Sequence, residues 1–212
     1  MLCLVTDRHL CGAEALEATV DAAVSGGVDL VQLREKDLPA GELLRLARSL
    51  RRITRGRAAL VINDRLDVAL AAEADGLHLP EASISVADAR AVAPSHLMIS
   101  KAVHDAAGAS EADAEGADML VLGTVFDTAS KPGAESGGLA LVREATRGVR
   151  APVLAIGGIG PANAGSVIEA GASGVAVISA IMSAADPESA ARELKQVMLA
   201  AWNSRERVGA GA

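Results

Sequence analysis

The chain has 212 residues and a formal net charge of −7, and half of its residues are apolar although it contains one Phe, one Trp and no Tyr. This length suffices for one barrel of modest size and is short for two domains, so we predict a single domain with a core of Ala, Val, Leu and Ile. Nucleic acid binding requires clustered Lys and Arg, and no basic run is present, so we expect no nucleic acid partner.

The sequence also lacks the features of an exported or membrane-bound protein. Cys3 and Cys11 form neither a disulfide framework nor a metal-ligand spacing, which is typical of a reducing cytosol. The first residues lack the basic region and the long apolar run of a signal peptide. The uncharged stretch 151–168 contains glycines and prolines, so it predicts strand, turn and helix rather than a membrane span. We therefore expect a cytoplasmic protein that does not bind a membrane.

Short apolar segments rich in Val, Ile and Leu alternate with helical patterns along the whole chain. Such segments are typical of parallel strands that are covered on both faces. A repeat with a small residue and usually an Asp recurs before the segments at 28, 76, 118 and 174. This alternation predicts an α/β fold, a single (β/α)8 TIM barrel. The eight predicted strands are residues 2–6, 28–33, 58–62, 76–79, 97–100, 118–122, 152–156 and 174–178.

Apolar stripes at helical spacing predict helices between these strands. The last helix is expected to begin with a cap at Asp186 and Pro187 at its first position. We expect the barrel to occupy residues 1–202 and the polar residues 203–212 to form a frayed tail. The three clearest stripes are Leu16, Thr19, Val20 and Ala23; Leu43, Leu46, Ala47, Leu50 and Ile53; and Ala191, Leu194, Val197, Met198 and Ala201.

The last two predicted strands end in residues with small or absent side chains. The strand 152–156 is followed by Gly157 and Gly158, and the strand 174–178, which ends at Ile178, is followed by Ser179. Glycine lets a ligand approach backbone N–H groups, and a (β/α)8 barrel often binds phosphate after strands seven and eight. These four residues are therefore predicted to bind phosphate, with a simple tight turn at the glycines as the alternative.

Polar residues follow nearly every predicted strand, at the end of the barrel where this fold carries its chemistry. Four cations fall there in spite of the negative net charge: Arg34, Lys36, Lys101 and Lys131. Their convergence on the glycine turn predicts an anionic ligand. The segment 124–138 is long for a loop between strand and helix, so we expect it to act as a lid or a ligand clamp.

Eight short motifs occur in order along the chain. They are Leu4-Val5-Thr6-Asp7, Gln32-Leu33-Arg34-Glu35-Lys36, Ile62-Asn63-Asp64-Arg65, Ala74-Asp75-Gly76-Leu77-His78, Gly123-Thr124-Val125-Phe126-Asp127-Thr128, Lys131-Pro132-Gly133, Ala155-Ile156-Gly157-Gly158-Ile159 and Val177-Ile178-Ser179-Ala180-Ile181. With them the sequence resembles the thiamin phosphate synthase and thiazole tautomerase (TenI) family over almost its whole length. The resemblance implies a (β/α)8 barrel that binds a small molecule, a thiazole phosphate, at Gly158 and Ser179. A homodimer is a further expectation.

The resemblance implies one of two activities. A synthase of this family joins an aminopyrimidine pyrophosphate to thiazole phosphate and uses Mg²⁺, which Asp64 would bind here. A tautomerase makes a carboxythiazole phosphate aromatic by proton transfer, needs no metal, and would use His104 as its catalytic residue. The residues that a synthase would use on the pyrimidine and pyrophosphate side are Gln32, Arg34, Lys36, Asn63, Thr128 and Lys131.

Two departures from the synthase pattern favour the tautomerase. Ser83 stands where a second carboxylate for Mg²⁺ is expected, and Mg²⁺ prefers carboxylate and phosphate oxygens. Ala102 replaces a Ser that would donate a hydrogen bond to the pyrophosphate. Asp64 and the motif at Lys131 remain typical of a synthase. We therefore predict a thiazole tautomerase, an isomerase without metal or other cofactor, with the Mg²⁺-dependent synthase as the alternative.

Other interpretations of individual residues remain open. His104 has the side chain best suited to proton transfer near neutral pH, although a histidine in a loop also often bonds to the backbone. Asp64 has an alternative role as the cap of the next helix. His78 ends a strand and is expected to pack in the barrel mouth. A third function, a regulatory protein that binds thiazole phosphate without catalysis, requires only the phosphate site.

Overall fold

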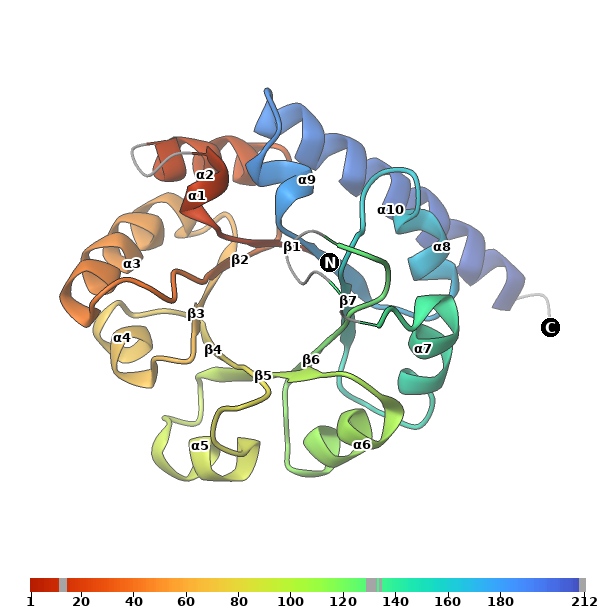
Figure 1. Cartoon of the computed structure of the whole chain (residues 1–212), viewed down its shortest axis with the longest axis horizontal. Coiled ribbons are helices and arrows are strands. Elements are labelled where there is room, and N and C mark those ends of the chain that lie inside the picture. Colours follow the sequence, from red (N-terminus) through yellow and green to blue (C-terminus); the bar gives the residue numbers. More distant parts are fainter. Residues whose placement is uncertain (12–14, 129–132, 134, 210–212) are drawn as a thin grey trace.

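The structure, a computed structural model, is a closed barrel of eight parallel strands (Figure 1), and it describes residues 1–11, 15–128, 133 and 135–209. Each strand pairs with its neighbour in sequence, and the last pairs with the first. The predicted (β/α)8 fold is therefore confirmed. The strands are β1 (Leu2–Val5), β2 (Leu30–Leu33), β3 (Ala59–Asn63), β4 (Gly76–Leu79), β5 (Met98–Val103), β6 (Met119–Leu122), β7 (Val153–Ile156) and β8 (Gly174–Val177).

Helices surround the strands as an outer ring (Figure 1). The predicted apolar stripes face inward, since Leu16, Leu50 and Leu194 are each at most 1% exposed. In the described part of the chain, no helix combines the length and the apolar character needed to cross a membrane. The helices are α1 (Arg8–Cys11), α2 (Leu16–Ser25), α3 (Ala40–Thr54), α4 (Leu66–Ala71), α5 (Val86–Val92), α6 (Ala106–Ala114), α7 (Gly138–Ala145), α8 (Ala164–Glu169), α9 (Ser179–Met182) and α10 (Pro187–Gly209).

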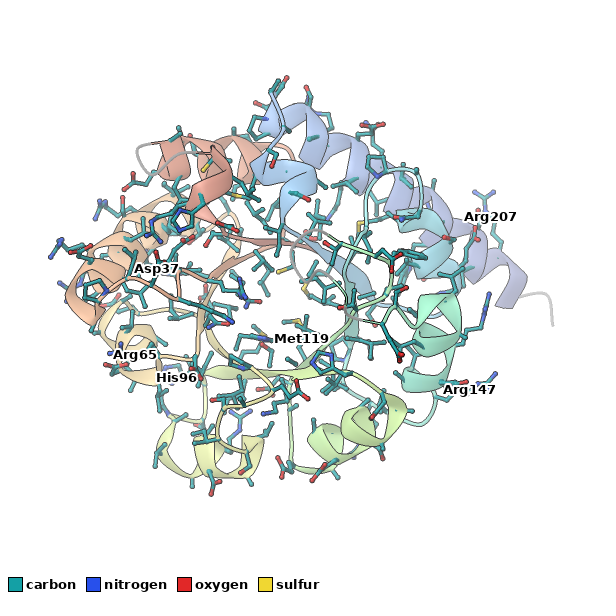
Figure 2. All side chains as sticks on the ribbon, viewed as in Figure 1. Asp37, Arg65, His96, Met119, Arg147 and Arg207 are labelled. Carbon is teal, nitrogen blue, oxygen red and sulfur yellow. The ribbon has the colours of Figure 1, made fainter. Side chains whose placement is uncertain are left out.

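The barrel interior has its own small apolar core, separate from the larger core between strands and helices. Figure 2 shows Met119 inside the ring of strands. Burial raises the pKa of the Cys3 thiol in this core to about 12, so the thiol stays neutral and packs as an apolar group. This core forms the floor below the open end of the barrel. Its buried residues are Cys3, Val5, Leu30, Val61, Met119, Leu154 and Ala176.

The repeated Asp seen in the sequence joins neighbouring strands at the amino-terminal end of the barrel. Each of these carboxylates accepts the backbone N–H of a residue near the start of the preceding strand and pairs with a cation from a helix. A carboxylate satisfies a strand-end donor that has no ladder partner, which explains why the Asp recurs. The N–H contacts are Leu2 N to Asp29 Oδ2 (2.6 Å), Leu60 N to Asp75 Oδ2 (2.7 Å) and Ile99 N to Asp118 Oδ2 (2.7 Å), and the paired cations are Lys195, Arg51 and Arg90.

The last helix is longer than predicted. We expected the barrel to end at residue 202 and a frayed tail to follow, whereas α10 continues to Gly209. The indole N–H of Trp202 donates to Glu206 Oε1 (2.9 Å), and the Arg205 guanidinium lies 4.2 Å from the Trp202 ring centroid. Arg205 also donates to the Ile168 carbonyl at the end of α8 (2.8 Å). The two contacts within α10 and the tertiary contact of Arg205 with α8 stabilise this polar segment as a helix. Residues 210–212 lie outside the described part.

Candidate functional site

A cavity of about 660 Å³ lies at the carboxyl ends of the strands. In this fold that end carries the chemistry, because the loops after all eight strands meet there. The cavity brings together most of the predicted binding residues, whereas Lys101 and Asp64 are absent from its lining and Lys131 lies outside the described residues. The predicted residues that line it are Gln32, Arg34, Lys36, Asn63, His104, Thr128, Gly157, Gly158, Ile178 and Ser179.

Two amide side chains lie side by side on one wall of the cavity. Gln32 ends near the top of β2 and is 4% exposed, and its Nε2 donates to Asn63 Oδ1 at the end of β3 (3.3 Å). This bond leaves Gln32 Oε1 as an acceptor and Asn63 Nδ2 as a donor without partners among the described residues. An adjacent acceptor and donor on a rigid wall suit a flat nitrogen heterocycle.

A clamp from α1 holds the loop after β2, which carries Arg34 and Lys36. The Arg34 N–H donates to Thr6 Oγ1 (2.9 Å). Glu35 is 5% exposed and accepts from the Arg8 side chain (3.1 Å). Arg8 also binds Asp37, and this contact lowers the pKa of the Asp37 carboxyl below its usual range. With Glu35 tied to Arg8, the side chains on either side of it, Arg34 and Lys36, line the cavity.

His78 lines the cavity although the sequence indicated only a packing role. It is 5% exposed, and its Nδ1 lies 2.9 Å from the hydroxyl of Ser100, which is fully buried. Burial, together with the charges of Arg34 and Lys101, lowers the pKa of His78 to about 4. His78 is therefore neutral near pH 7 and acts as a hydrogen-bonding group rather than as a cation. No pattern in the sequence indicates this partner, because Ser100 comes from the next strand.

The glycines after β7 have two structural roles. Gly157 (φ 109°) and Gly158 (φ 61°) adopt backbone conformations that strain other residues. A Cβ at Gly158 would lie 2.4 Å from the Asp127 carbonyl oxygen. The N–H groups of Gly158 and Ser179 donate no hydrogen bond within the described residues. The turn therefore accommodates a neighbouring loop and also leaves backbone donors open to the cavity.

The loop after β6 packs directly on this turn. Val125 donates its N–H to the Ile156 carbonyl (3.0 Å), and Phe126 donates to the Gly157 carbonyl (3.0 Å). The predicted lid at 124–138 lies partly outside the described residues, which omit 129–132 and 134. The described part is fixed to β7 by these two bonds.

His104 is held between two loops at the cavity rim. Its Nδ1 bonds to the Gly123 carbonyl, and its Nε2 lies 3.1 Å from Glu81 Oε2. The histidine thus makes the backbone bond that we considered as an alternative, and it also lines the cavity.

The prediction that Lys101 joins the cations of the cavity is wrong. β5 extends past the predicted end at residue 100 to Val103, so Lys101 lies within the strand and is absent from the cavity lining. Its ammonium donates to the carbonyls of Pro80 (3.0 Å), Glu81 (3.4 Å) and Ile84 (3.4 Å). Strand alternation places its side chain opposite to that of Ala102, which does line the cavity.

Carboxylates that could hold a metal are sparse. Among the described residues, no group of three or more His, Cys, Asp or Glu is placed to bind an ion. Asp64 is exposed, has a φ of 63°, and its carboxylate makes no hydrogen bond within the described residues. The residue that precedes α4 is Arg65, without a side-chain cap, so Asp64 does not cap this helix. Asp64 therefore presents one free carboxylate beside Asn63.

Comparison with known proteins places this site in a family. A family model described as Thiamine monophosphate synthase matches residues 2–181. A Putative thiamine-phosphate synthase of Geobacter sulfurreducens is 48% identical over 195 residues, which are 91% of this chain and 92% of the relative. A Thiamine-phosphate synthase of Roseiflexus sp. is 43% identical over 208 residues, 97% of this chain and 88% of the relative. The solved Thiamine phosphate pyrophosphorylase from Pyrococcus furiosus is 37% identical, with a TM-score of 0.87 over 94% of this chain and 96% of that one.

These relatives overturn the prediction of a thiazole tautomerase, and with it the assignment to the isomerase class. Their names are those of synthases, which are transferases, so they support the activity that we had placed second. We had given too much weight to Ser83 and Ala102. Mg²⁺ is often bound by one carboxylate together with water and substrate phosphates, so the loss of one ligand does not identify a branch of the family.

Proposed function

The chain belongs to the thiamine monophosphate synthase family, and we propose on this premise that it joins an aminopyrimidine diphosphate to a thiazole phosphate and releases diphosphate. The observation that carries the proposal is the composition of the cavity at the carboxyl ends of the strands. It combines an amide wall at Gln32 and Asn63, cations at Arg34 and Lys36, and a glycine turn at Gly158. The phosphate of one substrate, and the diphosphate and the flat pyrimidine ring of the other, each find a complementary surface there.

The thiazole phosphate is assigned to the glycine turn. The N–H groups of Gly158 and Ser179 are the donors that remain open there, and backbone donors of this kind bind phosphate oxygens without a competing side chain. Ile178 lies beside Ser179 and lines the same part of the cavity. The phosphate thus anchors the thiazole so that its ring projects into the barrel mouth.

The aminopyrimidine is assigned to the opposite wall. Asn63 Nδ2 and Gln32 Oε1 offer the donor and the acceptor for the ring nitrogen and the amino group. Arg34 and Lys36 lie beyond them and suit the diphosphate, since charge-assisted hydrogen bonds to phosphate are strong. Thr128 lines the cavity as well, and Lys131 is proposed to join this side although it lies outside the described residues.

The reaction breaks the C–O bond between the pyrimidine methylene and the diphosphate. The lone pair of the thiazole nitrogen forms the new C–N bond to that methylene, and the bonding electrons leave with the diphosphate. Arg34 and Lys36 stabilise the negative charge that develops on the leaving oxygen. The glycine turn and the amide wall bring the two reacting atoms together, and the filled cavity keeps water from the methylene.

The residues fit a Mg²⁺ ion that arrives largely with the diphosphate. Asp64 has a free carboxylate, and Mg²⁺ accepts one protein carboxylate together with water and substrate oxygens. Ser83 carries no carboxylate, and in the empty site Glu81 is paired with His104. When bound, the ion neutralises charge on the leaving diphosphate.

The test is to incubate the purified protein with both substrates, with and without Mg²⁺, and to detect the product by mass spectrometry. We expect thiamin phosphate and inorganic diphosphate in equal amounts. Binding of thiazole phosphate without any turnover would contradict the proposal and leave the regulatory protein as the better interpretation. Asp64→Asn should raise the Mg²⁺ concentration needed for half-maximal rate, and Ser83→Asp should lower it.

A further inference from the structure

Both ring nitrogens of His104 face hydrogen-bond acceptors. The Gly123 carbonyl accepts from Nδ1, and Glu81 Oε2 lies 3.1 Å from Nε2. A carbonyl oxygen cannot donate, so Nδ1 carries a proton, and a second proton must lie between Nε2 and Oε2 for that contact to be a hydrogen bond. The orientation of the ring is therefore fixed from one side, while Nε2 is directed at a carboxylate.

Only one partner in this contact is free to move. Lys101 holds the backbone of the loop after β4 through the carbonyls of Pro80, Glu81 and Ile84. The side chain of Glu81 is nevertheless 74% exposed, whereas that of His104 is 34% exposed. Apart from His104, Glu81 has no side-chain partner among the described residues. The carboxylate can thus swing into solvent without disturbing the loop or the imidazole.

We propose that Glu81 is a latch on His104, and that the diphosphate of the pyrimidine substrate displaces it and accepts the Nε2–H bond in its place. This inference rests on the proposed function and adds a diphosphate-binding role for His104 and a positioning role for Glu81. His104 supplies a donor on the wall where Ala102 has none.

Charge decides which acceptor holds the imidazole. An exposed carboxylate–histidine pair is weak because water screens it and the side chain loses freedom. A diphosphate carries more charge, and Arg34 and Lys36 attract it to the same cavity. Its approach also repels Glu81 directly. When diphosphate is bound, it therefore accepts the hydrogen bond from His104 Nε2. When the site is empty, Glu81 accepts this bond.

The latch is tested by calorimetric titration of the protein with inorganic diphosphate. Glu81→Gln removes the competing charge and should tighten binding about 3-fold, the size expected for an exposed pair. His104→Asn should weaken binding about 10-fold through the loss of a charge-assisted bond. In the double variant, Glu81→Gln should bring no gain. Weaker binding in Glu81→Gln, or the same gain with and without His104, overturns the latch.

Asp127 provides a matched control, since it also lines the cavity and its exposed carboxylate makes no hydrogen bond or ion pair with His104 among the described residues. Asp127→Asn should change diphosphate affinity equally with and without His104. Coupling as large as that of Glu81→Gln would mean a general charge effect and would overturn the latch.

Nitrogen NMR of the His104 ring tests the latch without any substitution. Inorganic diphosphate should shift the Nε2 resonance and leave Nδ1 on Gly123, and an unchanged Nε2 resonance overturns the proposal.

The assay for thiamin phosphate separates the latch from the proposed synthase activity. Product formation without coupling between positions 81 and 104 removes the latch alone, and coupling without product formation removes the proposed synthase activity alone.

Discussion

At the scale of single residues, neighbours decide which charged or polar side chains serve the cavity. Arg34 and Arg8 are both arginines close to the barrel mouth. Arg8 is engaged by Glu35 and Asp37, whereas the Arg34 side chain has no acceptor among the described residues and lines the cavity. Arg8 therefore holds the loop, and Arg34 remains available for a ligand.

Arg34→Ala should lower kcat/KM for the aminopyrimidine diphosphate about 100-fold, because one cation that stabilises the leaving group contributes on that scale. Arg45→Ala is the matched control, since Arg45 is exposed on α3 away from the cavity and should have no effect. Steady-state kinetics measures both. Equal rates for Arg34→Ala and Arg45→Ala would remove Arg34 from the site.

His78 should make the stability of the protein sensitive to mild acid. Its folded pKa of about 4 lies below the unfolded value of 6.5, so the unfolded chain takes up a proton that the folded protein excludes. The contribution is fully present above pH 6.5 and is lost as the pH falls toward 4. The full loss in the free energy of unfolding is about 3 kcal/mol, because a difference of one in pKa corresponds to about 1.36 kcal/mol.

Urea unfolding at pH 7 and at pH 4.5 measures this loss. The variant His78→Gln should be less stable than the natural protein at pH 7, and should lose less free energy of unfolding between the two pH values. The same loss in both proteins would show that other groups cause the acid sensitivity.

At the scale of elements, the turn after β7 and the loop after β6 depend on each other. The loop after β6 lies so close that Gly158 has no room for a Cβ. The backbone N–H groups of this loop donate to the carbonyls of Ile156 and Gly157. The glycine motif therefore positions a second loop as well as leaving N–H groups open. Phosphate binding and loop packing change together when this turn is altered.

Gly158→Ala should weaken binding of thiazole phosphate at least 10-fold, because its Cβ meets the Asp127 carbonyl and its φ is positive. Gly148→Ala is the matched control, since Gly148 also has a positive φ (79°), nothing lies within 4 Å of a Cβ there, and it does not line the cavity. Calorimetry should find nearly natural affinity for Gly148→Ala, in contrast to Gly158→Ala. Similar losses in the two variants would argue against a special role for the turn at 158.

At the scale of the whole molecule, the two ends of the barrel have separate tasks. The carboxyl end carries the cavity, and the amino end carries the repeated carboxylates that join neighbouring strands. Changes at the amino end should therefore alter stability and leave ligand binding intact.

Asp75→Asn tests this division. The substitution removes a charged acceptor from the Leu60 N–H and from Arg51, whose buried Nε already has no partner among the described residues. We expect a loss of about 1–2 kcal/mol in the free energy of unfolding, discounted for partial exposure. Glu73→Gln breaks an exposed pair with Arg55 and should have almost no effect. Denaturant unfolding compares them, and equal stability of the two variants would contradict the structural role of Asp75.

The sequence by itself determined the fold and the end of the barrel where polar residues gather. Strand period, apolar runs and glycines are local features, and Gln32, Arg34, Asn63 and Gly158 lie at or just after the carboxyl ends of strands that must point the same way in a parallel barrel. Its motifs also identified the family.

Only the tertiary structure decided how those residues are used. Lys101 left the cavity because strand alternation turned it toward the loop after β4, and His78 gained Ser100 from a neighbouring strand. His104 met Glu81 and Gly123 from two different loops. The relatives, rather than the tertiary structure, overturned the prediction of a tautomerase. Ser83 had misled that prediction, because water and substrate oxygens can take the place of a protein carboxylate on Mg²⁺. Such pairings join positions far apart in the chain, and their geometry exists only once the barrel has closed.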